Sequence, residues 1–159
     1  MLVISRSPEQ TRDLGERLGR VLGKGSVVAL VGELGSGKTV LAQGLARGLD
    51  VGPDEYVSSP SFALVNEYRG RVPVFHVDTY RLYGVSEMVA LGYEDLLEPE
   101  GVTIIEWADK VRELLPERHL LVELSIVDSK TRRITISLVG PWETELRARI
   151  GELVNQETA

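Results

Sequence analysis

The residues with the clearest potential for chemistry form the stretch GELGSGKT at Gly32–Thr39. They match the pattern G-x-x-x-x-G-K-[ST] at every defined position. Glycines let a backbone curl closely around phosphate oxygens, so that successive N–H groups form an anion nest. In such a loop the lysine reaches the β- and γ-phosphates and the hydroxyl ligates Mg²⁺. The expected nucleotide-binding residues of the stretch are Gly35, Ser36, Gly37, Lys38, Thr39 and Val40.

The elements around this loop are those that a phosphate site needs. Val27–Val31 is a continuous apolar run, which is typical of a strand buried in a parallel sheet. After the loop, apolar residues recur at helical spacing through Ala46. A helix N-terminus adds a partial positive charge that favours a bound anion. The complete match in this strand–loop–helix context argues against the alternative, a glycine-rich turn that binds nothing.

Two carboxylates follow apolar strands further along the chain. Glu106 comes directly after Thr103–Ile105, and Asp78 comes directly after Val74–Val77. In an open α/β sheet, the carboxyl ends of the strands face the ligand crevice. An acid there can bind Mg²⁺, directly or through water, or it can polarise an attacking water. The alternative for each acid is an ordinary helix cap or strand end.

Three other side chains carry weaker signals. Ser61 lies in the loop after the phosphate-loop helix, where switch segments place a hydroxyl near the γ-phosphate, although loop serines usually form turns. His76 lies on a predicted strand, which is more typical of a packed or surface histidine than of a catalytic one. Trp107 follows Glu106 and is more typical of a core side chain than of one packed near a nucleotide.

Composition narrows the class of protein. With 159 residues, the chain is expected to form one domain over residues 1–159. A net charge of −6 gives no support for independent binding of nucleic acid. The absence of cysteine excludes disulfides and thiolate metal sites. No run approaches the ~20 apolar residues of a membrane span, and the N-terminus lacks a signal peptide's apolar run, so we expect a soluble, cytoplasmic protein.

Hydrophobic periodicity and turn residues predict the remaining elements, and they alternate as in an α/β fold. Further strands are expected at 2–4, 63–68, 72–77, 102–105, 120–126 and 133–139, and those at 63–68 and 72–77 are expected to form an antiparallel hairpin. Further helices are expected at 8–22, 86–91 and 109–115 and from Pro141 onward, with an irregular acidic connection at 92–101.

These motifs together resemble the TsaE family, small bacterial P-loop ATPases of tRNA threonylcarbamoyladenosine (t⁶A) synthesis. A phosphate loop is shared by many families, so the resemblance rests on its combination with other motifs. These are Thr11-x-x-Leu14-Gly15, Ser59-Pro60-Ser61-Phe62, His76-Val77-Asp78-Thr79-Tyr80-Arg81, Leu91-Gly92 and Glu106-Trp107. The family usually has threonine where this chain has Ser61, which keeps the hydroxyl but confines its χ1 angle less.

The resemblance implies a fold, an activity and partners. The fold is a P-loop NTPase with a mixed parallel and antiparallel sheet flanked by helices. The activity is Mg²⁺-dependent ATP hydrolysis, slow in the isolated protein. The implied partners are TsaD and TsaB, which transfer a threonylcarbamoyl group to tRNA, and ATP hydrolysis resets that complex between rounds. Because of the negative net charge, tRNA contact is expected through the partners. The oligomeric state stays open.

The resemblance also implies residue roles. Lys38 and Thr39 hold phosphate and Mg²⁺, Glu106 contacts Mg²⁺ as the Walker-B-like acid, and Asp78 is the acid needed for hydrolysis. The expected catalytic residues are therefore Lys38, Asp78 and Glu106, and the expected metal ligands are Thr39 and Glu106. Thr11 matches a position near the nucleotide base, and we expect Arg133 nearby, with Lys130 and Arg132 as alternatives.

Two other classes of protein share the phosphate loop. A small kinase would need an acceptor pocket and usually an arginine-bearing lid, but the candidate insertion at 84–101 is acidic and has no arginine. A GTPase would need N-K-x-D and D-x-x-G motifs, and neither occurs. A nucleotide-bound interaction module without meaningful turnover stays open as the third alternative.

Overall fold

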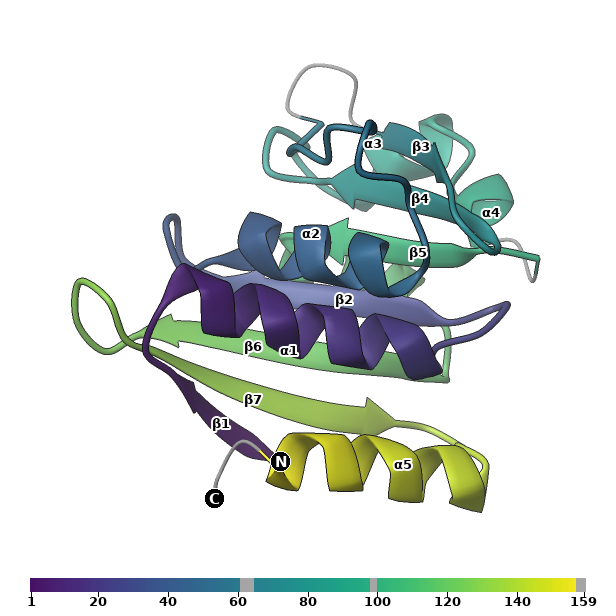
Figure 1. The fold of residues 1–159 in the computed structure, drawn as a ribbon. Coiled ribbons are helices and arrows are strands. Elements are labelled where there is room, and N and C mark those ends of the chain that lie inside the picture. The colour runs from purple at the N-terminus through teal and green to yellow at the C-terminus, as the bar shows by residue number, and fades with distance from the viewer. Residues whose placement is uncertain (61–64, 98–99, 157–159) are drawn as a thin grey trace.

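The computed structural model describes residues 1–60, 65–97 and 100–156. Within these residues, a seven-stranded sheet has the order β1-β7-β6-β2-β5-β4-β3 (Figure 1). The strands are β1 (Leu2–Ser5), β2 (Val27–Gly32), β3 (Val65–Arg69), β4 (Pro73–Asp78), β5 (Val102–Glu106), β6 (His119–Ile126) and β7 (Arg132–Val139). The helices are α1 (Pro8–Val21), α2 (Lys38–Gly48), α3 (Val85–Ala90), α4 (Tyr93–Leu96), the 3₁₀ helix η1 (Ala108–Leu114) and α5 (Thr144–Asn155).

The sheet is parallel at its centre and antiparallel toward both edges. The central strand β2 runs parallel to β5 and β6, and β4 runs parallel to β5. The pairs β3–β4, β6–β7 and β1–β7 are antiparallel. The predicted α/β fold with a mixed sheet flanked by helices is confirmed, as is the predicted hairpin, here β3–β4. In the described part of the chain, no helix combines the length and the apolar character needed to cross a membrane.

The apolar core is divided by the sheet into two layers. The larger layer packs α1, α2 and α5 against one face of the sheet (Figure 1). In this layer Leu14, Leu45 and Ile150 are fully buried. The smaller layer lies on the opposite face under α3 and η1, around Met88 and Val111. Since β2 has helices over both faces, its first four residues are all buried, which explains the unbroken apolar run in the sequence.

The helices α1 and α2 touch through their backbones. Gly15 and Gly19 on α1 face Gly44 and Gly48 on α2. A Cβ atom added to Gly44 would lie 2.1 Å from the carbonyl oxygen of Arg12, a distance that no side chain allows. The glycines therefore let α1 lie directly on the helix that begins at the phosphate loop.

One side chain joins the C-terminal ends of both helices to the β3–β4 turn. The guanidinium of Arg71 donates to the carbonyl oxygens of Gly48 at 2.6 Å and Gly19 at 2.7 Å, and also to that of Leu22. Carbonyls at a helix C-terminus lack partners within the helix and carry partial negative charge. A planar cation with several donors is well suited to such a cluster.

The prediction that the last helix begins at Pro141 is wrong, because α5 begins at Thr144. The indole Nε1 of Trp142 donates to the carbonyl oxygen of Val139 at 2.9 Å, and its ring is buried. Gly140 has a φ of 77°, so the chain turns there and seats Trp142 before the helix starts.

Two other elements differ from their predictions. The segment 92–101 contains the short helix α4, whose acidic first turn suits a helix N-terminus, rather than being irregular throughout. The helix predicted at 109–115 is the 3₁₀ helix η1, and it is interrupted at Val111, where φ is −128°. Val111 is fully buried, so packing has overridden regular helical geometry at this position.

Candidate functional site

The phosphate loop lies between β2 and α2, as predicted. Gly35 and Gly37 have φ angles of 80° and 100°, in the left-handed region that favours glycine. The backbone N–H of Ser36 donates to the carbonyl oxygen of Glu33 at 3.0 Å, and the Ser36 side chain is buried beneath the loop. The two glycines are therefore required by the turn itself.

Lys38 is the first residue of α2, and its side chain folds back under the loop. Its Nζ donates to the carbonyl oxygens of Gly32 at 2.6 Å and Glu33 at 3.0 Å. The same atom lies 4.0 Å from the centroid of the Trp107 ring, which is a cation–π contact. Burial lowers the pKa of Lys38 below its ordinary value, and nearby carboxylates, Glu106 foremost, oppose that shift.

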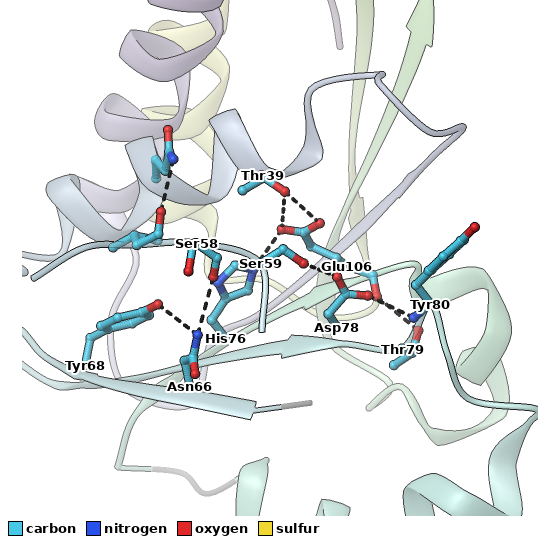
Figure 2. A network of polar contacts seen from close by, with 12 residues as sticks. Thr39, Ser58, Ser59, Asn66, Tyr68, His76, Asp78, Thr79, Tyr80 and Glu106 are labelled. Atoms are coloured by element: carbon cyan, nitrogen blue, oxygen red, sulfur yellow. Dashed lines mark hydrogen bonds and ion pairs between the residues drawn. The ribbon is translucent and has the colours of Figure 1, made fainter. Parts of the chain in front are cut away.

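The carboxylate of Glu106 is the meeting point of three elements (Figure 2). Thr39 from α2 donates its hydroxyl to both Glu106 oxygens, at 3.0 and 3.1 Å. The Nε2 of His76, from β4, lies 2.8 Å from Glu106 Oε1. Glu106 itself ends β5 and is only 2% exposed. A buried carboxylate is thus fixed beside the hydroxyl of the phosphate loop.

Asp78 lies beside Glu106, because the two acids are opposite one another in the parallel β4–β5 pair. Its Oδ1 accepts from the backbone N–H of Tyr80 at 2.8 Å, and its Oδ2 accepts from the Ser59 hydroxyl (Figure 2). The hydroxyl of Thr79 donates to the Glu106 carbonyl oxygen at 3.0 Å, which fastens the two strand ends together. The prediction that both acids lie at the same sheet edge is confirmed.

These side chains line a cavity of about 470 Å³, a size typical of small-molecule sites. Of the predicted site residues, it is lined by Gly35, Gly37, Lys38, Thr39, Val40, Asp78 and Glu106. It is also lined by Leu34, Ser59, Tyr80, Arg81 and Trp107. A second cavity, of about 420 Å³, lies between α1, α2 and residues 51–57 and contains none of the predicted catalytic residues.

Among the described residues, three predicted nucleotide contacts lie outside that lining: Thr11, Ser36 and Arg133. Thr11 is buried, and its Oγ1 lies 2.7 Å from the Oγ of Ser5. Its methyl group faces the loop, since a Cβ added to Gly37 would lie 3.9 Å from Thr11 Cγ2. Thr11 therefore lies close to Gly37 of the loop without lining the cavity. Ser61 lies outside the described residues.

Arg132, rather than Arg133, touches the phosphate loop. Its guanidinium donates to the carbonyl oxygen of Gly35 at 3.0 Å. Successive side chains of a strand point to opposite faces, so Arg133 is directed away from Arg132, and it is exposed. The predicted strand begins at Arg133, and the strand pattern alone does not distinguish Arg133 from the alternative Arg132.

Sequence reasoning missed the importance of His76 and Trp107. His76 is a packed histidine, as expected, but it also reaches Glu106. The expectation that Trp107 belongs to the core is wrong, because the ring is half-buried, lines the cavity and lies 4.8 Å from the Tyr80 ring. One signal was available: His76 stands two positions before Asp78, and residues two apart on a strand share a face.

The donor set fits a magnesium ion carried by a phosphate. The Thr39 hydroxyl and the Glu106 carboxylate are hard oxygen donors, which Mg²⁺ prefers. Two protein ligands leave coordination positions for phosphate oxygens and water, which is how Mg²⁺ is usually held in nucleotide sites.

A central parallel strand, a glycine-rich turn into a helix and an acid on the neighbouring parallel strand define the P-loop class of nucleotide-binding α/β proteins. The family model described as "Threonylcarbamoyl adenosine biosynthesis protein TsaE" matches residues 5–134. The chain belongs to this family, and the resemblance stated from its motifs is confirmed.

Curated relatives and a solved structure agree with this assignment. The tRNA threonylcarbamoyladenosine biosynthesis protein TsaE of Treponema pallidum (strain Nichols) is 38% identical over 137 residues, which cover 86% of this chain and 100% of that protein. The protein of the same name from Mycobacterium tuberculosis (strain ATCC 25618 / H37Rv) is 42% identical over 137 residues, 79% of each chain. The crystal structure of Bacillus subtilis YdiB superposes with a TM-score of 0.76 at 28% identity, covering 99% of this chain and 95% of that one.

Proposed function

We propose that this chain is the ATP-binding and ATP-hydrolysing component of the tRNA t⁶A modification machinery, acting with TsaD and TsaB. Family membership and the names of the relatives support the pathway. The observation that carries the nucleotide chemistry is the buried Glu106 carboxylate, held against the Thr39 hydroxyl at the mouth of the phosphate loop. A Thr–acid pair at this place is the ligand set that P-loop proteins use for Mg²⁺.

In this proposal, the residues of the site divide the work. The loop N–H groups and the N-terminus of α2 hold the phosphates, and the Lys38 ammonium neutralises charge on them. Thr39 and Glu106 hold Mg²⁺, which when bound neutralises charge that develops on the phosphate oxygens. Asp78, next to Glu106 at the sheet edge, orients the attacking water.

The segment 51–60, which precedes β3 in the chain, couples this chemistry to partner contacts. Ser59 donates to Asp78, and the carbonyl oxygen of Val57 accepts from Gln43 Nε2, on α2, at 3.0 Å. A partner that moves this segment changes the surroundings of Asp78 directly. With a net charge of −6, the chain leaves most of the tRNA contact to TsaD and TsaB.

The test is phosphate release from ATP, measured for this chain alone and with purified TsaD and TsaB. We expect slow intrinsic turnover that rises with the partners and disappears in Lys38→Ala, which also loses nucleotide binding. Equal turnover with and without the partners would contradict the coupling. ATP binding without turnover under either condition would instead favour a nucleotide-bound interaction module, and retained ATP affinity in Lys38→Ala would overturn the site.

A further inference from the structure

We propose that His76 is a positioning residue that holds the Glu106 carboxylate in line with the Thr39 hydroxyl. The inference rests on the proposed Mg²⁺–nucleotide site. His76 Nε2 lies 2.8 Å from Glu106 Oε1, and the two side chains are 1% and 3% exposed. In the tautomer with its proton on Nε2, the imidazole donates to Glu106, whose carboxylate oxygen accepts.

The surroundings of His76 favour an apolar side chain. His76 points toward α2 from the same face of β4 as Val74, and its partner on β5 is the buried Ile104. Its second ring nitrogen, Nδ1, is buried and has no hydrogen-bond partner among the described residues. Burying an unpartnered polar atom costs stability, and an aromatic hydrocarbon of similar size would avoid that cost. The contact made by Nε2 is therefore what explains a histidine here.

The contact fixes which way Glu106 faces. A glutamate side chain has several staggered rotamers, and its terminal torsion is broad. His76 holds Oε1 from β4, while Thr39 meets both oxygens from α2, so the carboxylate has a single orientation between them (Figure 2). Hydrogen bonds behind a ligating carboxylate set its orientation, and their loss typically weakens metal affinity ~10–100-fold.

Two substitutions test whether the hydrogen bond from His76 to Glu106 is needed, because glutamine and asparagine place an amide nitrogen at different distances from the backbone. In His76→Gln, the amide nitrogen lies about as far from the backbone as Nε2, whereas in His76→Asn it lies nearer to the Nδ1 position and stops short of Glu106. ADP affinity is measured by calorimetric titration at increasing Mg²⁺ concentrations and in EDTA. We expect His76→Asn to raise, ~10–100-fold, the Mg²⁺ concentration that gives half of the maximal increase in ADP affinity. The ADP affinity of His76→Asn in EDTA should equal that of the unmodified chain. In His76→Gln, the Mg²⁺ dependence of ADP affinity should return most of the way to that of the unmodified chain.

Val74→Ala is the matched control for packing, because Val74 is fully buried on the same strand and face but two residues further from the site. It should lower the melting temperature without moving the Mg²⁺ dependence. Melting curves identify the variants that are folded at the assay temperature, and His76→Phe, which fills the ring space without a donor, replaces His76→Asn if that variant unfolds.

The outcomes separate this inference from the proposed function. Wild-type Mg²⁺ dependence in His76→Asn, or an equal shift in Val74→Ala, would overturn the positioning role and leave the nucleotide site intact. If ADP binding to the unmodified chain did not depend on Mg²⁺, the proposed metal site would fail, and this inference with it.

Discussion

Helix α2, on which α1 lies, and the segment 51–60 both border the nucleotide cavity, α2 through residues 38–40 and the segment through Ser59, but they are attached to the molecule in different ways. The backbones of α1 and α2 are in direct contact at facing glycines, and Arg71 donates hydrogen bonds to the C-terminal ends of both helices. Val51 is joined to α2 by its backbone N–H, which donates to the carbonyl oxygen of Ala46 at 3.0 Å. Residues 52–60 have no regular helix or strand and are held by individual hydrogen bonds that involve the side chains of Gln43, Glu55, Ser59 and Asn66.

This difference separates binding from control. A backbone contact cannot be changed without moving a whole helix, so the phosphate loop at the start of α2 has a fixed base. A contact made by one side chain can be exchanged at a cost of about 1 kcal/mol. The proposed partner coupling therefore belongs to the segment 51–60, and substitutions can test the two attachments separately.

The largest effect is expected where the helices touch. Gly44→Ala places a Cβ 2.1 Å from the Arg12 carbonyl oxygen, and backbone cannot yield as a flexible side chain would. We expect a loss of about 3 kcal/mol in the free energy of unfolding, measured by urea denaturation. Gly151→Ala is the matched control on α5, because nothing lies within 4 Å of its added Cβ. That variant should gain about 0.5–1 kcal/mol, and equal effects of the two changes would refute the close approach.

A smaller effect is expected at the segment. Ser59→Ala removes the hydroxyl that donates to Asp78, and the loss in stability should be about 1 kcal/mol. ATP affinity should be retained, whereas the ratio of partner-stimulated to intrinsic turnover should fall toward one. Ser58→Ala is the control, since Ser58 is held through its carbonyl oxygen, which accepts from Asn66. A stimulation ratio unchanged in Ser59→Ala would place the coupling elsewhere.

The same contrast explains what the sequence could predict. The phosphate loop is encoded by consecutive residues, so its position, its strand and its helix were all predictable. The strand-end rule also placed Asp78 and Glu106 at one edge. The contact of His76 with Glu106 depends on β4 lying next to β5, and that of Arg132 with Gly35 depends on where β7 lies. Local hydrophobic periodicity predicts neither the order of the strands in a sheet nor the side chains that meet across it.

Local signals also failed where a tertiary contact competed with them. Pro141 is a typical first residue of a helix. The indole of Trp142, however, donates a hydrogen bond to the carbonyl oxygen of Val139, and α5 begins only at Thr144. Trp107 follows a buried strand and looks apolar in sequence, yet its backbone is left-handed, with φ of 56°, and its ring turns toward Lys38. Such a conformation is uncommon for a bulky residue and occurs here beside the site.

The smallest effect concerns Lys38, on the fixed side of the comparison. Burial lowers the pKa of Lys38 in the folded state, so in the pH range between that pKa and the ordinary value of 10.5 the unfolded chain binds more protons. Stability therefore rises with pH through that range, and the penalty for the buried ammonium is fully present below it. Lys38→Met keeps the length of the side chain and removes the titration. Urea denaturation of both proteins from neutral pH to pH ~10 should show the unmodified chain gaining stability relative to Lys38→Met as the pH rises. A parallel pH dependence of the two would mean that the ammonium is as well stabilised under the loop as it is in water.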